Sequence, residues 1–402
     1  MQVTITPKRA QGRIAAPPSK SMAHRLLICA ALSEGKSRVC GISHCADVSA
    51  TLDCLRVLGV ECQQEGDCVT VCGKDIRDAV PTSPLLCRES GSTLRFMIPI
   101  AMLSGNPVTL HGAPYLMQRP MSVYVDLCKE KNLFFQQEGQ DITVKGRLPA
   151  GEYTVAGNIS SQFISGLLFA LPLTDGNSVI RILPPLESRS YLDLTVSALR
   201  MFGVNVTWEN AYTISIPGNQ HYLAQDTTVE GDYSNAAFLD AFNLLGGDVT
   251  VEGLRPDSLQ GDRVYPDYFA QLRRGRAELC IGNCPDLGPI LFAVAAAKHG
   301  GVFHETRRLR MKESDRAAVM AEELAKFGTR VKVFEDSVEI DPVDFHAPTV
   351  PIDGHNDHRI VMSMAVLLSL TGGTLIGSEA VAKSFPDFFD RLRQLGLEIR
   401  EE

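Results

Sequence analysis

The sequence contains no long hydrophobic run. Its longest nearly apolar segments, such as Ile360 to Leu370, are shorter than the roughly 18 residues that span a membrane. The first ten residues, MQVTITPKRA, contain no apolar stretch either. We therefore expect neither a secretory signal nor a membrane helix, and we expect a cytoplasmic protein.

A long basic run is also missing. The chain has 39 Lys and Arg against 47 Asp and Glu, a formal net charge of −8. Nucleic acid and anionic membranes are therefore not expected as partners. Any anionic ligand must be bound by a local group of positive charges.

The 11 cysteines form no regular framework, because their number is odd and nine of them precede residue 130. We expect a reducing compartment and free thiols. Two C-x3-C pairs, Cys68–Cys72 and Cys280–Cys284, are weak zinc candidates, since no second pair of the usual spacing accompanies either. No metal and no organic cofactor are expected, and Trp208, the only tryptophan, is expected to pack in a hairpin.

The chain does contain an internal repeat, which sets the architecture of a protein. An apolar, helix-like run that ends at glycine and continues into a strand-like segment recurs six times, at Gly35, Gly105, Gly176, Gly247, Gly301 and Gly373. A second amphipathic helix follows in each unit, as Phe385, Phe388, Phe389, Leu392 and Leu395 illustrate, and then a strand pair. Six such units predict an α/β protein of two domains with three units each.

One unit is shorter than the others. The fifth unit, as counted from the sequence, passes from Arg274 to Cys280 with almost no room for its final hairpin. We expect one or two strands to be missing there.

The residues that open the first helix of each unit are mostly Ser, Asn and Asp. They read SKS at 19–21, SGS at 90–92, SSQ at 160–162, YSN at 233–235, PDL at 285–287 and NDH at 356–358. Each can simply cap its helix. Helix N-termini also bind anions through unpaired N–H groups and a partial positive charge. Six related helix starts therefore predict a site for a substrate with several negative charges.

Basic residues lie near these helix starts. Lys20, Arg25, Arg95 and Arg359 are close to them in sequence, and Arg119, Lys312, Arg316 and Lys383 lie on the connecting segments. Arginine binds carboxylates and phosphates in a two-point manner, whereas lysine supplies a compact charge. Their placement supports an anionic substrate.

Ten short motifs carry a resemblance to a known family. The sequence resembles the EPSP synthases, or 3-phosphoshikimate 1-carboxyvinyltransferases, which belong to the enolpyruvyl transferases. The motifs are PPSKSMAHR at 17–25, ESGSTLR at 89–95, QRPM at 118–121, ISSQF at 159–163, SRSYLD at 188–193, VEGDYSNAAF at 229–238, CPDLGPILF at 284–292, RMKESDR at 310–316, NDHR at 356–359 and AKSFPDFF at 382–389.

The resemblance implies a fold and a reaction. The fold would be two domains of three units with pseudo-threefold symmetry, residues 1–14 with 228–402 and residues 15–227, and the active site would lie in the cleft between them. The reaction would join phosphoenolpyruvate to the 5-hydroxyl of 3-phosphoshikimate and release phosphate, in the shikimate pathway to aromatic amino acids. We expect a monomer whose partners are these small-molecule substrates.

The resemblance also implies the site residues. The 3-phosphoshikimate site would contain Lys20, Ser21, Arg25, Ser160, Ser161, Gln162, Ser188, Tyr191, Asp286 and Lys312. The phosphoenolpyruvate site would contain Lys20, Gly91, Arg119, Gln162, Arg316, Arg359 and Lys383. Asp286, Glu313 and Lys20 would transfer protons.

These residue types suit the chemistry. Both substrates carry a carboxylate and a phosphate, so binding them together requires many fixed cations and N–H donors. The enol methylene carbon must gain a proton while the 5-hydroxyl loses one, which requires an acid and a base. Asp286, at a helix start, could accept the hydroxyl proton.

The sequence departs from the family pattern at two positions, one in the ESGSTLR motif and one just before RMKESDR. Glu89 replaces a residue that is often Asn; it could pair with Arg88 or Arg119, or be solvated. Arg308 replaces another frequent Asn and could be an extra phosphate contact or a surface charge. We expect His358 to position Arg359 rather than to act as an acid or base.

Two alternatives remain open at this stage. A UDP-N-acetylglucosamine enolpyruvyl transferase shares the fold and chemistry, but Pro114 stands where that family usually carries a cysteine. A non-catalytic binding module would use the same anion site without needing Asp286 and Glu313.

Overall fold

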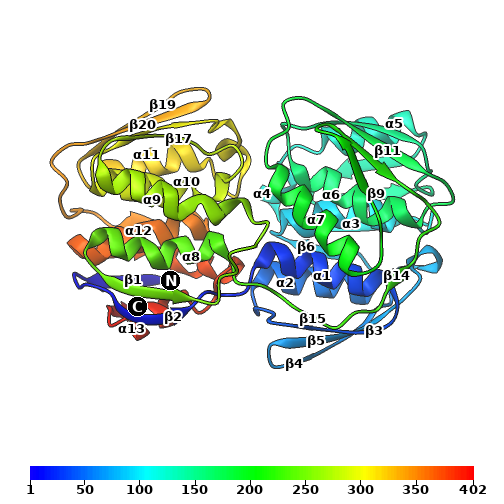
Figure 1. The fold of residues 1–402 in the computed structure, drawn as a ribbon, viewed down its shortest axis with the longest axis horizontal. Coiled ribbons are helices and arrows are strands. Elements are labelled where there is room, and N and C mark those ends of the chain that lie inside the picture. The colour runs from blue at the N-terminus through cyan, green and yellow to red at the C-terminus, as the bar shows by residue number, and fades with distance from the viewer. The chain divides into compact units, whose positions relative to one another are not determined.

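The chain crosses twice between two units. In the computed structural model, which describes all 402 residues, unit 1 comprises Met1–Ser19 and Glu230–Glu402, and unit 2 comprises Lys20–Val229 (Figure 1). The crossings lie after Ser19 and Val229, whereas the sequence placed them after residues 14 and 227. Strand β2 (Gln11–Ala15) runs parallel to β16 (Asp248–Glu252), and this pairing keeps residue 15 in unit 1.

Each unit contains three copies of one motif. In the second, third and fifth repeats, a first helix joins two parallel strands, and a second helix then leads to a hairpin that pairs antiparallel with the second strand. In the first, fourth and sixth repeats, one or more strands come from a distant part of the chain. Parallel strands need such a crossover, and a helix that packs on the sheet provides it. The α/β class and the three repeats in each unit are therefore confirmed.

Unit 2 holds the first three repeats. The first contains α1 (Lys20–Leu32), β3 (Ser33–Cys40), α2 (Ala46–Val57), β4 (Glu61–Glu65) and β5 (Cys68–Gly73), completed by β14 (Tyr222–Leu223) and β15 (Thr227–Thr228). The second contains β6 (Leu85–Arg88), α3 (Gly91–Ala101), β7 (Val108–Gly112), the short α4 (Pro114–Met117), α5 (Ser122–Glu130), β8 (Phe134–Glu138) and β9 (Asp141–Lys145). The third contains β10 (Glu152–Ala156), α6 (Ser161–Ala170), β11 (Ser178–Leu183), α7 (Arg189–Met201), β12 (Thr207–Asn210) and β13 (Thr213–Ile216).

Unit 1 holds the other three repeats. The fourth contains β2, α8 (Tyr233–Asp240), β16 and α9 (Tyr265–Arg274). The fifth contains β17 (Ala277–Cys280), α10 (Gly288–Ala297), β18 (Gly301–His304), α11 (Arg316–Ala325), β19 (Thr329–Val333) and β20 (Ser337–Pro342). The sixth contains β21 (Ile352–Asp353), α12 (His358–Thr371), β22 (Gly373–Ile376), α13 (Phe388–Gln394), β23 (Glu398–Glu401) and β1 (Gln2–Thr6).

Short 3-10 helices complete the two units. They are η1 (Ile76–Asp78), η2 (Leu171–Leu173), η3 (Ala241–Leu245), η4 (Gly261–Val264), η5 (Pro285–Leu287), η6 (Arg307–Met311) and η7 (Ser378–Lys383).

The shortened repeat lacks its whole hairpin. Strands β2 and β16 form a two-stranded sheet, whereas the other five sheets have four or five strands. Helix α9 ends at Arg274 and β17 begins at Ala277, so no residues remain for two more strands. The missing strands belong to the fourth repeat in chain order, which corrects the assignment to the fifth.

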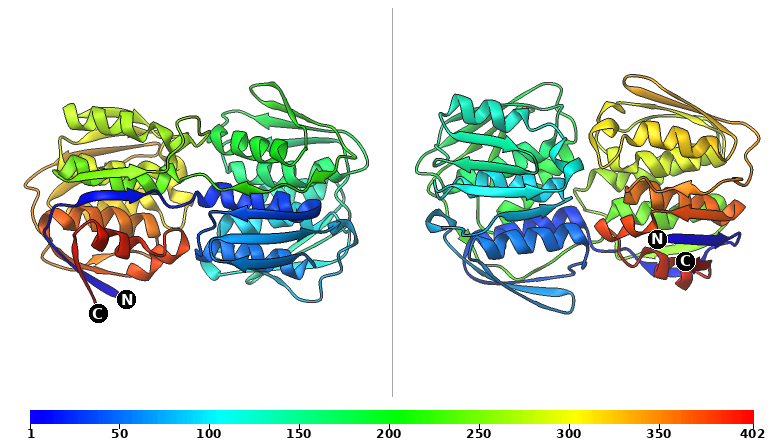
Figure 2. Two further views of the ribbon diagram at one scale, coloured as in Figure 1. Left: turned by 60° about the horizontal axis from the view of Figure 1, so that its bottom comes forward. Right: turned by 180° about the vertical axis from the view of Figure 1, so that it is seen from behind.

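The first helices of the repeats form the interior of each unit. Every residue of α10 except Ala297 is buried, and α3 is buried everywhere except at Ser92. Helices that are apolar on all sides are typical of a protein interior. In unit 2, α3 packs against α6, and in unit 1, α10 packs against α12. The sheets lie on the outside of these helices in both units (Figure 2).

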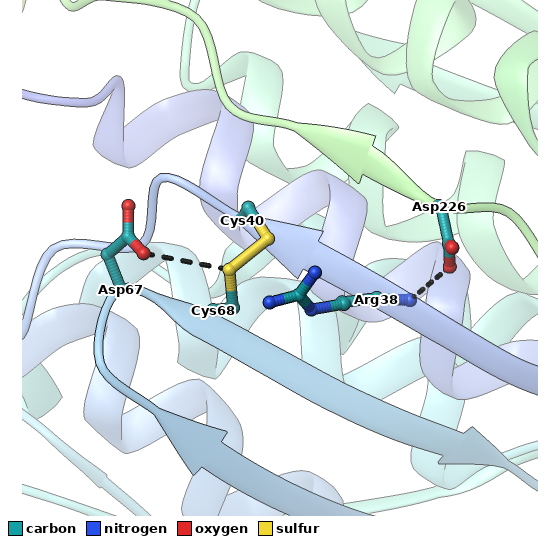
Figure 3. Close-up of a disulfide and its surroundings, with 5 residues drawn as sticks. All are labelled: Arg38, Cys40, Asp67, Cys68 and Asp226. Atoms are coloured by element: carbon teal, nitrogen blue, oxygen red, sulfur yellow. Dashed lines mark hydrogen bonds between the residues drawn. A yellow bond between two sulfur atoms is a disulfide. The ribbon is translucent and has the colours of Figure 1, made fainter.

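One disulfide contradicts the expectation of free thiols throughout. Cys40, at the end of β3, and Cys68, at the beginning of β5, are joined by an S–S bond (Figure 3). The antiparallel register pairs Val39 with Val69, which places Cys40 opposite Cys68. Cysteine spacing alone does not reveal strand register. The other nine cysteines are free, and Cys68 is not available for a zinc pair with Cys72.

None of the helices combines the length and the apolar composition that a membrane crossing requires.

Candidate active site

Side chains cap the starts of the first helices α3, α6, α8 and α12. Ser90 Oγ accepts a hydrogen bond from the Thr93 amide at 3.2 Å, and Ser160 Oγ accepts one from the Gln162 amide at 3.3 Å. In unit 1, Asp357 accepts from the Arg359 amide at 2.9 Å. These caps hold the helix starts in the extended-to-helical turn that the sequence predicted.

Two helix starts differ from the prediction. Helix α8 is capped by Asp232, which accepts from the Asn235 amide at 2.8 Å, one residue before the predicted Tyr233 opening. Helix α10 begins after the 3-10 turn η5, and Asp286 in that turn contacts cations instead of capping the helix.

Arg25 connects two of the predicted motifs in unit 2. Its guanidinium donates to Thr195 Oγ1 at 2.8 Å, to the Ser21 carbonyl at 2.6 Å and to the Tyr191 carbonyl at 2.9 Å. Burial lowers the pKa of Arg25 to about 10, so the side chain remains charged at neutral pH. The Tyr191 amide donates to the Ser188 carbonyl at 3.1 Å, and Ser188 has a left-handed φ of 56°. The structure thus brings Ser21, Arg25, Ser188 and Tyr191 together.

Lys20 is paired with a carboxylate that the sequence analysis did not identify. Its Nζ lies 2.8 Å from Asp47 Oδ2, and both side chains are largely buried. The Asp47 carbonyl accepts from Thr93 Oγ1 at 3.4 Å, and the same hydroxyl donates to Ser90 Oγ at 2.8 Å. Lys20 is therefore linked through Asp47 to the start of α3.

Gly91 allows Arg119 to approach the start of α3. A Cβ at Gly91 would lie 2.8 Å from Arg119 NH1, closer than any side-chain carbon tolerates, and 3.4 Å from Arg95 NH1. Arg95 NH1 in turn donates to Gln162 Oε1 at 2.7 Å. Gly91, Arg119 and Gln162 therefore surround one region of unit 2, beside the buried Ser161.

We call the predicted residues of unit 2 the unit 2 cluster. Its members are Lys20, Ser21, Arg25, Gly91, Arg119, Ser160, Ser161, Gln162, Ser188 and Tyr191.

Arg316 is the centre of the predicted residues in unit 1. Its NH1 lies 2.8 Å from Asp286 Oδ1, and its NH2 lies 2.7 Å from Glu313 Oε2. Its Nε lies 2.8 Å from Asp357 Oδ2. Burial lowers the pKa of Arg316, but Asp357, Glu313 and Asp286 outweigh burial and raise it above its usual value. This guanidinium is permanently charged.

Asp286 is shared among three cations. In addition to Arg316, Lys312 and Arg359 contact its carboxylate. Lys312 Nζ lies 3.2 Å from Asp286 Oδ1, and Arg359 NH2 lies 3.6 Å from Asp286 Oδ2. Burial, with the charges of Arg308 and Arg316, lowers the pKa of Lys312 to about 8, although Asp286 and Glu313 act in the opposite direction. Lys312 is thus a cation that can lose its proton at mildly alkaline pH.

Lys383 and His358 lie at the turn before α12. Lys383 Nζ donates to the Asn356 carbonyl, which brings η7 to this turn. His358 is buried beside Arg359, which supports a packing or positioning role. We call Asp286, Lys312, Glu313, Arg316, Arg359 and Lys383, with Asp357, the unit 1 cluster.

Sequence reasoning missed the charged residues Asp47 and Asp262, and it gave Arg95 and Asp357 no substrate role. Asp47 and Arg95 support the unit 2 cluster, and Asp357 pairs with Arg316. Asp262, in η4, is buried; its burial and the charge of Asp286 raise its pKa to about 7 despite the opposing charge of Arg359. Arg95 and Asp357 lie within the motifs ESGSTLR and NDHR, which could have indicated a role in the site. Asp47 and Asp262 lie in none of the motifs, so nothing in the sequence indicated them.

Of the two departures from the family pattern, Arg308 is buried and Glu89 is exposed. Arg308 is only 7% exposed, and its charge lowers the pKa of Lys312, so it is not a surface charge. Glu89 is exposed, and its neighbour Arg88 pairs with Asp53.

One group outside both clusters has metal-ligand chemistry. Glu322, Glu323 and His355 place ligand atoms within 4.8 Å of one another. However, the Glu323 carboxylate already accepts from Lys326 Nζ at 2.7 and 2.9 Å and from the Asp353 amide at 3.0 Å. The lysine ammonium supplies the positive charge that a metal would bring.

Comparisons with known proteins agree with one another. The sequence profile of EPSP synthase (3-phosphoshikimate 1-carboxyvinyltransferase) matches residues 5–392. A 3-phosphoshikimate 1-carboxyvinyltransferase of Clostridium kluyveri is 38% identical, over 99% of this chain and 98% of its own. One of Clostridioides difficile is 36% identical, also over 99% and 98%.

Solved structures show the same fold. An EPSP synthase of Acinetobacter baumannii superposes with a TM-score of 0.78 at 25% identity, over 100% of both chains. The enolpyruvyl transferase NikO of Streptomyces tendae superposes with a TM-score of 0.76 at 16% identity, over 99% of this chain and 98% of its own, which shows the fold alone.

Proposed function

The chain belongs to the EPSP synthase family, and we propose that the unit 2 cluster and the unit 1 cluster bind its substrates and carry its chemistry. The reaction transfers the enolpyruvyl group of phosphoenolpyruvate to the 5-hydroxyl of 3-phosphoshikimate and releases phosphate, in the shikimate pathway to aromatic amino acids. The assignment of individual residues to each substrate, given below, is our proposal.

Arg25 and its neighbours would bind 3-phosphoshikimate. Arg25 is fixed by three hydrogen bonds, and the hydroxyls of nearby serines and Tyr191 are suited to phosphate and hydroxyl oxygens. The complete set is Lys20, Ser21, Arg25, Ser160, Ser161, Gln162, Ser188 and Tyr191, with Asp286 and Lys312 from unit 1.

Phosphoenolpyruvate would be bound by the remaining cations. Arg119, beside Gly91, and Arg316, Arg359 and Lys383 of unit 1 can neutralise its phosphate and carboxylate. Lys20 and Gln162 complete this set. Fixed cations offset the repulsion between two polyanionic substrates, at no cost of reorganisation during the reaction.

The proton transfers would use carboxylates held by cations. Asp286 would accept the proton of the 5-hydroxyl as its oxygen attacks the enol carbon. Glu313, with Lys20, would deliver the proton that the methylene carbon gains. Elimination of phosphate then restores the double bond: the methyl carbon returns its proton to Glu313 and Lys20, and the proton held by Asp286 leaves with the phosphate, so atoms and charge balance.

We further propose that the enzyme acts as a monomer in the cytoplasm. It would need no partner beyond the two small molecules.

The observation that carries this assignment is the sharing of Asp286 among Lys312, Arg316 and Arg359. A carboxylate among three cations is costly to build for stability alone, and it offers both a base and an anion site.

The test removes one cation at a time. Lys20→Met and Arg119→Ala should each abolish turnover while circular dichroism and melting temperature stay near those of the wild type. The control is Arg181→Ala, because Arg181, in β11, is exposed and forms an ion pair with the exposed Glu152. A near wild-type rate in either site variant would remove that residue from the site.

A further inference from the structure

Arg95 has no part in the functions assigned above, yet its side chain lies beside Gly91 and Gln162 of the unit 2 cluster. It belongs to α3 and is 3% exposed. Its guanidinium carbon lies 5.0 Å from the centroid of the Phe163 ring, and its NH2 donates to the Pro120 carbonyl at 3.4 Å. These contacts leave the guanidinium little freedom to move.

Its NH1 determines how the amide of Gln162 is oriented. NH1 donates to Gln162 Oε1 at 2.7 Å, and Gln162 Nε2 donates to Ser92 Oγ at 2.9 Å. A guanidinium has only donors, so it can contact the oxygen of the amide and not its nitrogen. If the Gln162 amide were flipped, its NH2 group would face the N–H groups of Arg95, and no hydrogen bond could form between them.

The orientation decides what Gln162 offers to a ligand. Its oxygen is engaged by Arg95, and one N–H is engaged by Ser92. The second N–H remains as a donor, and Gln162 is partly exposed. Gln162 would therefore contact an oxygen that accepts a hydrogen bond, as carboxylate, phosphate and ether oxygens do.

We propose that Arg95 is a positioning residue for the transfer reaction, which fixes the Gln162 amide so that Gln162 acts toward the substrates only as a donor. The inference rests on the proposed function, because the contact of Gln162 with the substrates belongs to it. Arg95 itself acts through Gln162.

A purely structural role for Arg95 would look different. The Tyr124 hydroxyl donates to the Arg95 carbonyl at 2.7 Å, and this contact holds the α3 backbone whatever side chain stands at 95. If Arg95 were only structural, its replacement would lower stability, and it would lower activity equally whether or not Gln162 is present. A positioning role predicts that the effect depends on Gln162.

The test is a double-mutant cycle on kcat/KM for both substrates. Arg95→Lys keeps the charge but loses the planar guanidinium, and it should lower kcat/KM at least tenfold in the wild-type background. Combined with Gln162→Ala, it should change kcat/KM less than twofold. The control Arg181→Lys, at an exposed ion pair of the same unit, should stay within twofold of wild type.

An equal loss from Arg95→Lys in both backgrounds would overturn the proposal, while leaving the proposed function intact. An unchanged kcat/KM in Gln162→Ala alone would instead contradict the proposed role of Gln162, and the inference with it.

Gln162→Glu provides a second test that leaves Arg95 in place. The carboxylate can still accept from Arg95, so the melting temperature should not fall, but it has no N–H to donate. Activity should drop as in Gln162→Ala. Wild-type activity in Gln162→Glu would overturn the proposal even if Arg95→Lys failed to fold.

Discussion

The Arg316 guanidinium and the Asp357 carboxylate form a two-point ion pair that is closed to solvent. Nε lies 2.8 Å from Oδ2, NH2 lies 3.2 Å from Oδ1, and the two side chains are 1% and 0% exposed. Asp357 also caps α12 through the Arg359 amide. A buried ion pair contributes little net stability, so its main effect is to orient Arg316 and Arg359.

Gly91→Ala should weaken the binding of phosphoenolpyruvate. The new Cβ would lie 2.8 Å from Arg119 NH1, so the guanidinium must move. Loss of one charge-assisted contact costs about 1.5–3 kcal/mol, which corresponds to a rise in KM of roughly 10- to 150-fold. Steady-state kinetics with phosphoenolpyruvate varied would measure it.

The control is Gly275→Ala, since Gly275 has extended backbone and nothing within 4 Å of its Cβ position. If KM for phosphoenolpyruvate did not change in Gly91→Ala, Arg119 would not be a ligand.

Asp286→Asn should lower the rate far more than the affinity. The amide keeps the shape of the side chain but cannot accept the hydroxyl proton. We expect kcat to fall about 10²- to 10⁴-fold, with a much smaller change in KM for 3-phosphoshikimate. The matched control is Asp240→Asn, a half-buried carboxyl of the same unit whose Oδ1 accepts from Asn243 Nδ2 at 2.7 Å. A wild-type kcat in Asp286→Asn would exclude Asp286 as the base.

Activity should decrease above about pH 8 because Lys312 loses its charge. Burial lowers the pKa of Lys312 from its usual 10.5 to about 8 in the folded, unliganded protein. Above that pH, kcat/KM for 3-phosphoshikimate should fall, by at most tenfold per pH unit. The unfolded chain binds the proton more tightly, so this lysine makes the fold relatively more stable as pH rises from 8 to 10.5.

The variant Lys312→Arg tests whether the loss of activity near pH 8 comes from Lys312 or from another group. Arginine stays protonated throughout the range, so the decrease near pH 8 should disappear. An unchanged pH profile in Lys312→Arg would show that another group titrates.

Cys40→Ser should destabilise unit 2 by about 3–4 kcal/mol, because the disulfide closes a loop across 28 residues of the unfolded chain. Urea unfolding would measure the loss, and wild-type protein in reductant should show the same value. The control Cys280→Ser removes an exposed free thiol and should change little.

Thiol titration of the denatured protein gives an independent count. Nine thiols should react before reduction and eleven after it. Eleven thiols without reductant would show that the disulfide does not form.

Local sequence signals predicted most of the helix starts. Ser90, Ser160 and Asp357 are capping residues by their chemistry, and the glycine-bounded repeat predicted the three motifs of each unit. The clustering of the cationic motifs also followed from their equivalent places in the repeat.

Features that depend on contacts between distant segments could not be predicted. The disulfide depends on the register that places Cys40 opposite Cys68, and spacing in sequence carries no register. The sequence left Arg308 open between a phosphate contact and a surface charge, because the packing of η6 decides whether its side chain is buried. Asp232 replaced the predicted Tyr233 opening, since several polar residues before α8 are equally suitable caps.

The most direct measurement of the central claim is phosphate release from phosphoenolpyruvate, with 3-phosphoshikimate and UDP-N-acetylglucosamine offered in parallel. The account predicts release with 3-phosphoshikimate alone, in a one-to-one ratio with the carboxyvinyl product. Release with UDP-N-acetylglucosamine and none with 3-phosphoshikimate would contradict it.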